Sequence, residues 1–201
     1  MTRKALVLAV LSTIPGFGNE HLNVLLCNFG RLPDATTARA MRVVEAIFRP
    51  MRIDMHWSAC RIGAGAQDSW TSRTLIVRLR RDGPAHGAAS FVDVMGTAFT
   101  EDGGAGYLAD AYYGAIYGFA LDHQSDPAEA LGYVMAHEIG HLLLGAGHAE
   151  GTIMSARWNA KSLAAARQRW LRFSPSQRAA IHRELQAGTV LTASVRRTIA
   201  D

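Results

Sequence analysis

The chain has 201 residues, enough for one domain with a sizeable hydrophobic core. Hydrophobic residues make up 49% of it and charged residues 19%, which excludes an intrinsically disordered protein. The net charge of +4 is modest, and no apolar run is long enough to span a bilayer, which excludes a membrane-spanning protein.

The first 18 residues have the layout of a secretory signal peptide. Arg3 and Lys4 form a basic start, an apolar run follows over residues 5–14, and small residues lead up to Gly18. We expect cleavage after Gly18 and a protein that is secreted or periplasmic. The alternative is that this run forms a first strand of the core.

A βαβ unit is expected next. Residues 22–29 (LNVLLCNF) and 52–60 (RIDMHWSAC) are typical of strands, and between them apolar residues recur at helical spacing. Asp34 can cap that helix and Pro50 marks its end. Two strands joined through a helix are expected to be parallel.

The chain has two cysteines, Cys27 and Cys60, and neither belongs to a CxxC motif. In an exported protein the two can pair in a disulfide, and two buried thiols are the alternative.

Further strands are expected over residues 73–80 (RTLIVRLR) and 90–99 (SFVDVMGTAF). After a glycine-rich turn, residues 107–119 (YLADAYYGAIYGF) are compatible with strand, helix or both.

A well-delimited helix is predicted over residues 127–144. Asp126 can accept hydrogen bonds from the free N–H groups of the first turn, Pro127 suits the first helical position, and Glu129 completes a capping-box pattern. Gly145 ends the helix. The helix is apolar on nearly all sides, so we expect it to be buried.

Short helices are predicted near residues 161–170 and over 175–187, where Ser174 is the cap and Pro175 the first residue. We expect a single domain over 19–188 and a loosely held tail over 189–201. Seven basic residues and no acidic one lie between Glu150 and Glu184. We interpret them as a solvated basic face, with contact to an anionic surface as the alternative, and the sparse aromatic residues argue against nucleic-acid binding.

The predicted helix 127–144 contains the motif HExxH. His137 and His141 are four residues apart, so both rings project from one face and can share one zinc ion. Glu138 lies to the side of that face, where it can take a proton from a zinc-bound water without binding the metal. The alternative is a pair of hydrogen-bonded core histidines and a surface glutamate.

These residues resemble the metzincin clan of zinc metallopeptidases, whose signature is HExxHxxGxxH followed by a Met-turn. His137, Glu138, His141, Gly145, His148 and Met154 occur in that order, and the stretch is also similar to small bacterial zincins of unassigned substrate. The resemblance implies three histidine ligands to one catalytic zinc ion, with Met154 in a tight turn beneath the metal. It also implies that an edge strand near 91–99 pairs with an extended peptide.

The sequence departs from the signature by one residue. Gly145 follows His141 by four positions instead of three, and His148 follows it by seven instead of six. His148 is our expected third ligand, and Glu150, Glu184 and His123 are the alternatives. Some metzincins have a tyrosine two positions after the methionine that can assist the oxyanion, and Ala156 occupies that position here.

The expected fold is α+β and metzincin-like: a twisted, mixed but mostly parallel sheet, a long active-site helix and a small helical C-terminal subdomain. The expected function is zinc-dependent endopeptidase activity on a protein or peptide, by Glu138-assisted attack of a zinc-bound water. A secreted, zinc-stabilised binding domain without catalysis is one alternative. A toxin or effector protease that acts on one specific protein is another, supported only by the basic segment.

Overall fold

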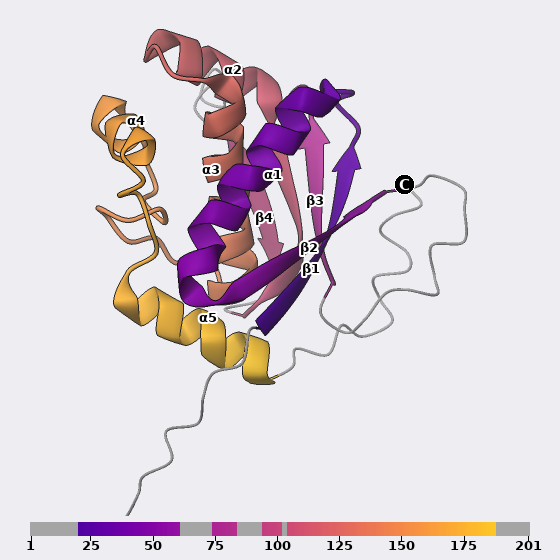
Figure 1. Ribbon diagram of the computed structural model, residues 1–201, viewed down its shortest axis with the longest axis vertical. Coiled ribbons are helices and arrows are strands. Elements are labelled where there is room, and N and C mark those ends of the chain that lie inside the picture. Colours follow the sequence, from indigo (N-terminus) through magenta and orange to yellow (C-terminus); the bar gives the residue numbers. More distant parts are fainter. Residues whose placement is uncertain (1–19, 61–73, 84–93, 102–103, 188–201) are drawn as a thin grey trace, which may run out of the picture.

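Five strands form one sheet, in which the chain visits the positions out of sequence order (Figure 1). The computed structural model describes residues 20–60, 74–83, 94–101 and 104–187, so the predicted leader over 1–18 and tail over 189–201 lie outside it. The order across the sheet is β2-β1-β3-β5-β4. The strands are β1 (Glu20–Asn28), β2 (Ile53–Ala59), β3 (Thr74–Arg80), β4 (Gly96–Thr100) and β5 (Gly106–Tyr112).

The sheet is parallel except at one edge. β1 is parallel to both β2 and β3, and β3 is parallel to β5, whereas β4 is antiparallel to β5. The predicted βαβ unit is confirmed, with α1 (Asp34–Phe48) connecting β1 to β2. The interior position of β1 explains its nearly continuous apolar sequence, because strands of a parallel sheet are covered on both faces.

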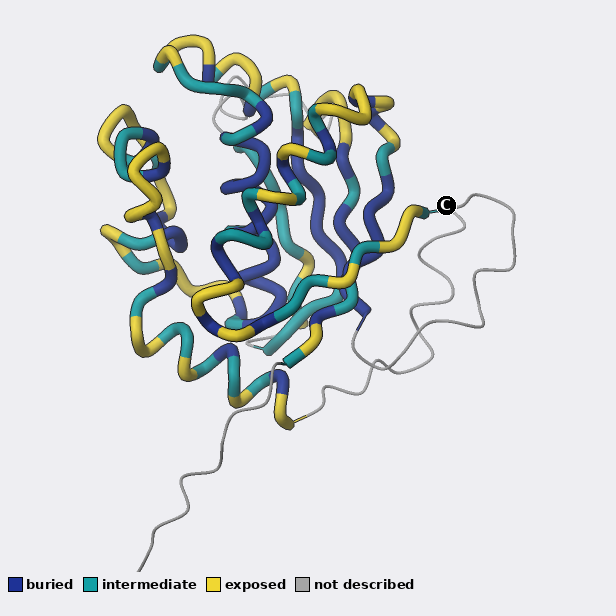
Figure 2. Tube along the Cα trace, in the orientation of Figure 1, coloured by how far each residue is buried: buried dark blue, intermediate teal, exposed yellow. Residues whose placement is uncertain are grey.

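The main core lies between the sheet and two helices, α1 and α3 (Pro127–Leu144). Figure 2 shows that α3 and the central strands carry most of the buried chain. The two helices approach closely at Gly132, where an added Cβ would lie 2.5 Å from the Cβ of Val43 and 2.7 Å from the carbonyl oxygen of Ala40. A larger residue at position 132 would therefore push the helices apart.

The segment 107–119 is both strand and helix: β5 ends at Tyr112 and α2 (Tyr113–Asp122) begins at once. Gly114 makes this possible, because its N–H donates to the carbonyl of Arg81 at 2.8 Å and an added Cβ would lie equally close to that oxygen.

The edge strand is shorter than the predicted strand over 90–99. It begins at Gly96, residues 94 and 95 precede it without regular structure, and residues 90–93 lie outside the described part. A register shift separates Phe99 from Thr100, where Gly106 of β5 packs directly against the Phe99 carbonyl. β4 therefore extends to Thr100, one residue beyond the predicted end, with a shift in its pairing to β5 at that last residue.

The two C-terminal helices, α4 (Ala160–Arg167) and α5 (Pro175–Ala187), pack directly on the body of the protein. Tyr133 of α3 donates to the carbonyl of Ala166 at 2.7 Å, and His182 and Gln186 of α5 contact Glu20 of β1. α4 ends three residues before the predicted position, because Arg169 adopts a left-handed conformation with φ of 59°. The predicted cap of α5 is confirmed: Ser174 accepts from the N–H of Gln177, whose side chain accepts in return.

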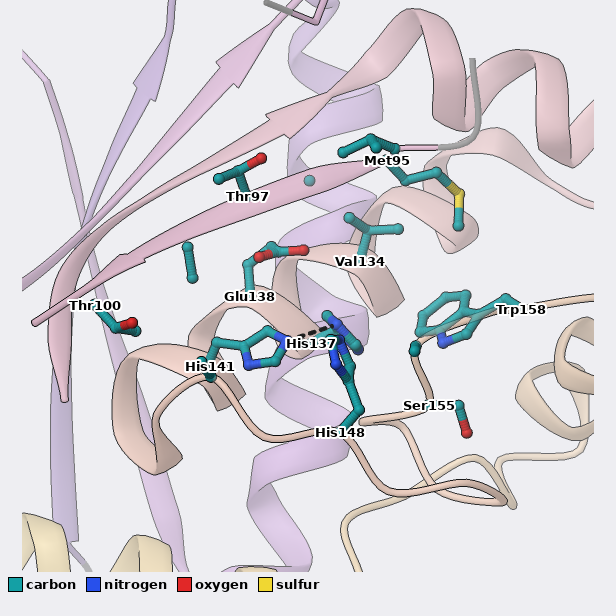
Figure 3. A pocket seen from close by; sticks show the side chains of 15 residues that line it. Met95, Thr97, Thr100, Val134, His137, Glu138, His141, His148, Ser155 and Trp158 are labelled. Atoms are coloured by element: carbon teal, nitrogen blue, oxygen red, sulfur yellow. Dashed lines mark hydrogen bonds between the residues drawn. The ribbon is translucent and has the colours of Figure 1, made fainter. Parts of the chain in front are cut away.

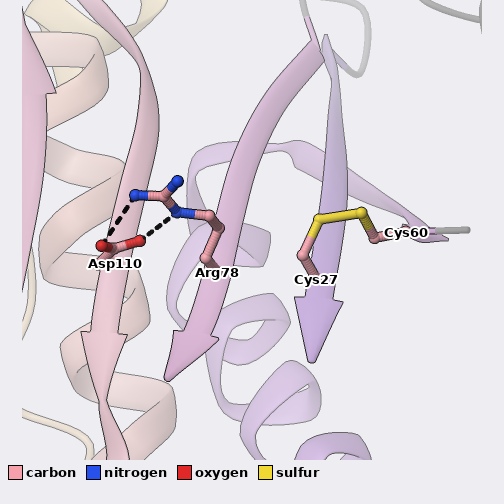
Figure 4. Close-up of a disulfide and its surroundings, with 4 residues drawn as sticks. All are labelled: Cys27, Cys60, Arg78 and Asp110. Atoms are coloured by element: carbon pink, nitrogen blue, oxygen red, sulfur yellow. Dashed lines mark hydrogen bonds and ion pairs between the residues drawn. A yellow bond between two sulfur atoms is a disulfide. The ribbon is translucent and has the colours of Figure 1, made fainter. Parts of the chain in front are cut away.

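Cys27 and Cys60 are joined in a disulfide, as the pairing alternative predicts (Figure 4). Cys27 lies in β1 and Cys60 directly follows β2, so the bond links two neighbouring parallel strands. Within the described ranges, no helix combines the length and apolarity that a bilayer crossing requires.

Candidate metal centre

Helix α3 carries the HExxH motif and has the predicted bounds. Asp126 accepts from the N–H of Glu129 at 2.9 Å and also pairs with Arg39 of α1. Gly145 follows the helix with φ of 83°, and its N–H donates to the carbonyl of His141. These contacts fix both ends of α3, so the motif lies on a rigid element that is packed between the sheet and the C-terminal helices.

The rings of His137 and His141 are oriented by backbone carbonyls. Nδ1 of His137 is 2.7 Å from the carbonyl oxygen of Ile153, and Nδ1 of His141 is 2.9 Å from that of Gly145. A carbonyl can only accept, so each Nδ1 carries the proton and each Nε2 keeps a free lone pair. The two Nε2 atoms lie 3.0 Å apart (Figure 3).

His148 reaches the same point from the loop after α3. Its Nε2 is 3.2 Å from Nε2 of His141, and one ligand atom from each of the three histidines lies within 4.8 Å of the others. The sequence Gly145-Ala146-Gly147 absorbs the extra residue: Gly145 adopts positive φ, and an added Cβ at Gly147 would meet nothing within 4 Å.

A tight turn beneath the histidines contains Met154. The N–H of Ala149 donates to the carbonyl of Met154 at 2.9 Å, and the Thr152 hydroxyl bridges the two sides of the turn. Met154 is fully buried, and an added Cβ on Gly140 of α3 would lie 2.5 Å from its sulfur and 2.8 Å from the ring of Phe173. The turn is thus packed against the helix face between His137 and His141.

Glu138 points into the site from the side of the histidine face (Figure 3). It is only 5% exposed, and its carboxylate has no hydrogen-bond partner among the described residues. Burial, and secondly the charge of Asp110, raise its pKa to about 8. Burial disfavours the ionised form, so the metal-free protein holds Glu138 protonated near neutral pH, and a cation beside it would favour the carboxylate that can act as a base.

The donor set fits a cation. Burial lowers the pKa of His137 to about 4 and also lowers the pKa of His141, so both rings are neutral at pH 7. Neutral rings with Nε2 lone pairs 3.0 Å apart repel one another unless a positive charge lies between them. In tetrahedral zinc sites the nitrogens are about 3.3 Å apart, which is close to the separations seen here.

An open cleft of about 360 Å³ lies over these residues. α3 supplies its floor with His137, Glu138 and His141, and the loop after α3 supplies His148. β4 forms the opposite wall, where Gly96 packs directly against the Glu138 carboxylate and leaves no space for a Cβ. The remaining lining residues are Val94, Met95, Thr97, Ala98, Thr100, Val134, Ala146, Ser155, Ala156 and Trp158.

The alternative third ligands lie outside this cluster, because the histidine group of the described residues contains only His137, His141 and His148. His123 follows α2, with Nδ1 2.8 Å from the Phe119 carbonyl, and precedes the start of α3, which itself lies about 15 Å of helix rise from His137. Glu150 is exposed in the turn, and Glu184 belongs to α5. The identity of the ligands stays a prediction, now with a geometry that supports it.

Three neighbours of the site were not anticipated from the sequence. Trp158 packs edge-on against His137 at 5.9 Å between ring centroids, and Gly96 makes room for Glu138. Behind β4, the buried Asp110 of β5 accepts two hydrogen bonds from Arg78 of β3 (Figure 4). The signal for this contact is that two mostly apolar strands carry charges of opposite sign, Arg78 and Arg80 in β3 and Asp110 in β5.

Comparisons with known proteins show a shared fold. No family model matches the sequence, and no curated protein matches it either. The crystal structure of archaemetzincin from Methanopyrus kandleri is similar with a TM-score of 0.51 and 16% identity, over 83% of this chain and 96% of that one. Metalloproteinase-II from Bacteroides fragilis has a TM-score of 0.49 and 15% identity, over 85% of this chain and 55% of its own.

Proposed function

We propose that the protein is a zinc-dependent metalloendopeptidase in which His137, His141 and His148 hold one zinc ion and Glu138 is the general base. One observation carries the proposal: three imidazole nitrogens converge beside a buried carboxylate on the floor of an open cleft. The similarity of the fold to that of archaemetzincin supports it.

Bound zinc and Glu138 have different roles in peptide hydrolysis. When bound, zinc polarises the peptide carbonyl and lowers the pKa of an adjacent water. Glu138 removes a proton from that water as its oxygen bonds to the carbonyl carbon, and the same proton passes to the leaving nitrogen as the C–N bond breaks. Glu138 returns to its initial state. Its carboxylate has no partner among the described residues, which leaves it free for this role.

We further propose that β4 binds the substrate backbone. β4 is an edge strand of the described sheet, paired only with β5, and it lines the cleft. An extended peptide can therefore add to its free edge through backbone hydrogen bonds. Beside His137, the side chains of Met95, Val134 and Trp158 line an apolar part of the cleft (Figure 3), which suits an apolar side chain next to the cleaved bond.

The geometry favours catalysis over a purely structural zinc site. Structural sites are closed by four protein ligands, whereas catalytic sites have three and one open position. The histidine group of the described residues offers three ligands and faces a cleft. A structural site also gives no reason to bury the unpartnered Glu138 beside the metal position.

We propose export of the protein as well. The disulfide between Cys27 and Cys60 supports it, because disulfides persist in oxidising compartments such as the periplasm and the extracellular space. A protein recovered from periplasm or medium that begins at Asn19 supports both export and the cleavage site. An intact Met1 there contradicts cleavage, and a protein confined to the cytoplasm contradicts export.

The function is tested by zinc content and proteolysis together. Purified protein is expected to contain one zinc per chain and to cleave an unfolded protein. The proteolytic activity should be lost after chelation and return when zinc is added back. The Glu138→Gln protein, prepared identically, is the control for a contaminating protease. Zinc-loaded protein that cleaves no unfolded substrate contradicts the proposal and leaves the zinc-stabilised binding domain.

A further inference from the structure

The outer face of α2 is apolar and exposed. Tyr117 and Leu121 are 45% and 53% exposed, and their spacing of four residues places them on one side of the helix. The neighbouring face, about 100° around the helix, carries Ile116 and Ala120, which are fully buried in the core. The apolar surface of α2 thus extends from the core to the solvent, and only its inner part contacts the protein.

A third exposed apolar side chain lies near the end of α2. Trp170 is 75% exposed, the highest fraction among the large hydrophobic residues of the described part. Its N–H donates to the carbonyl of Ala165, which fixes it at the C-terminal end of α4. Arg167 of α4 donates to the carbonyl of Gln124, two residues beyond α2, so the ends of the two helices are neighbours. Figure 1 shows both helices at the same end of the molecule.

The surroundings of Trp170 are strongly basic. Together, α2 and residues 160–172 contain a single acidic residue, Asp122, and four basic ones: Lys161, Arg167, Arg169 and Arg172. All four are exposed, and none of them forms an ion pair with another residue in the part of the chain that the structure describes. Unpaired cations on one surface create a local positive potential that attracts an anionic partner.

We propose that this surface, made of Tyr117, Leu121, Trp170, Lys161, Arg167 and Arg169 and named here the α2–α4 surface, docks the protein on anionic phospholipid membranes. Tyrosine and tryptophan suit the membrane interface because each has an apolar ring and a polar tip. The basic side chains attract anionic headgroups while the apolar ones enter the acyl boundary. The proposal does not depend on the metal chemistry.

The arrangement suits lipid better than other anionic partners. Single-stranded nucleic acid stacks successive bases on several aromatic side chains, and Trp170 is the single exposed tryptophan among the residues that the structure describes. The three apolar side chains lie on the outer face of α2 and just after the end of α4, at exposed fractions of 45% or more, as insertion into a soft surface requires. α4 begins two residues after Trp158, so docking would hold the cleft beside the membrane.

The test is co-sedimentation of the intact, metal-loaded protein with vesicles. Vesicles containing phosphatidylglycerol are expected to bind it, vesicles of phosphatidylcholine alone to bind it far less, and added salt to weaken the binding. Removing two charges with Lys161→Gln and Arg169→Asn should weaken binding about 25-fold, at about fivefold for each charge. The matched control is Arg42→Gln with Arg31→Asn: Arg42 is also helical and exposed, and Arg31 also has positive φ.

Two further variants separate the apolar part of the surface. Trp170→Ser should weaken binding about tenfold, whereas Phe29→Ser, which removes another exposed aromatic residue, should leave it unchanged. The fluorescence of wild-type protein should shift to shorter wavelength on binding, and Trp170→Phe should abolish the shift. Equal weakening by test and control pairs, equal binding to both kinds of vesicle, or binding only to oligonucleotides or acidic peptides overturns the proposal.

Discussion

The candidate ligands are held in two different ways. His137 and His141 lie on a capped helix, and a backbone carbonyl fixes the Nδ1 of each. His148 lies on an exposed loop, with open space around Gly147 and no hydrogen bond from its Nδ1 among the described residues. The helix half of the site is organised before metal binds, whereas the loop half depends on its turn and on the metal itself. This difference explains how a longer spacing is tolerated in the loop, where an insertion in the helix would rotate one ligand by about 100°.

The largest effect is expected at Glu138. Its substitution tests whether catalysis can be lost while His137 and His141, on the same helix, still bind zinc. Glu138→Gln keeps the volume of the side chain but removes the base, so kcat should fall by about three orders of magnitude or more. Zinc content and Tm should stay close to wild type. Metal analysis and turnover of a quenched peptide measure both, and substantial activity in the purified variant would refute the assigned role.

The loop half is tested by removing its ligand. His148→Ala should weaken zinc binding by more than about 100-fold and abolish turnover, because a ligand matters more than the outer-shell partners that cost 10- to 100-fold. Glu150→Ala and His123→Ala are the controls and should retain both zinc and activity. Retention of stoichiometric zinc by His148→Ala, together with its loss in one of the controls, would show that the third ligand is assigned wrongly.

Substitutions at two glycines compare how tightly the helix and the loop are packed, through their effects on protein stability. Gly140→Ala should lower the free energy of unfolding of the zinc-loaded protein by about 1–3 kcal/mol, because the new methyl group collides with Met154 and Phe173. Gly147→Ala should be neutral or stabilising by up to about 1 kcal/mol, since nothing lies within 4 Å of the new Cβ. Denaturant titration measures both, and equal costs would mean that the loop is as tightly packed as the helix.

The smallest effect concerns pH in the metal-free protein. The pKa of Glu138 is raised from 4.5 to about 8, so the proton it holds stabilises the fold at low pH, and that stability is lost as pH rises through 8. Glu138→Gln has no such dependence, so its unfolding free energy minus that of wild type should grow by about 2 kcal/mol between pH 6.5 and 8. The His137 contribution, which is lost as pH falls below 6.5, is common to both proteins and cancels. A difference independent of pH would show that the carboxyl is hydrated.

The helix half of the site could be predicted from sequence because its signals are local. Asp126, Pro127 and Gly145 delimit α3, and the four-residue spacing places His137 and His141 on one face. The path to His148 could not be derived in the same way, because it depends on the positive φ of Gly145 and on the packing of Met154 against Gly140. Signals from residues close in sequence define α3, but they do not define the loop that follows it.

The same distinction holds for the sheet. The parallel pairing of β1 and β2 follows from the connecting helix, which is a local rule. The reversed direction of β4 and its late start at Gly96 depend on contacts with β5 and with Glu138, which lies far away in the sequence. The ion pair of Arg78 and Asp110 spans two strands 32 residues apart. For such non-local contacts, the sequence identifies the residues but does not identify which residue each one contacts.

The contact between Glu20 and α5 has a consequence for how the chain folds. His182 and Gln186 lie 162 and 166 residues beyond Glu20, yet both bond to its carboxylate at the start of β1, an interior strand of the sheet. Because these contacts have such high sequence separation, they form late and slow the acquisition of the native state. α5 follows all five described strands along the chain, so this contact can form only after the whole sheet has been synthesised.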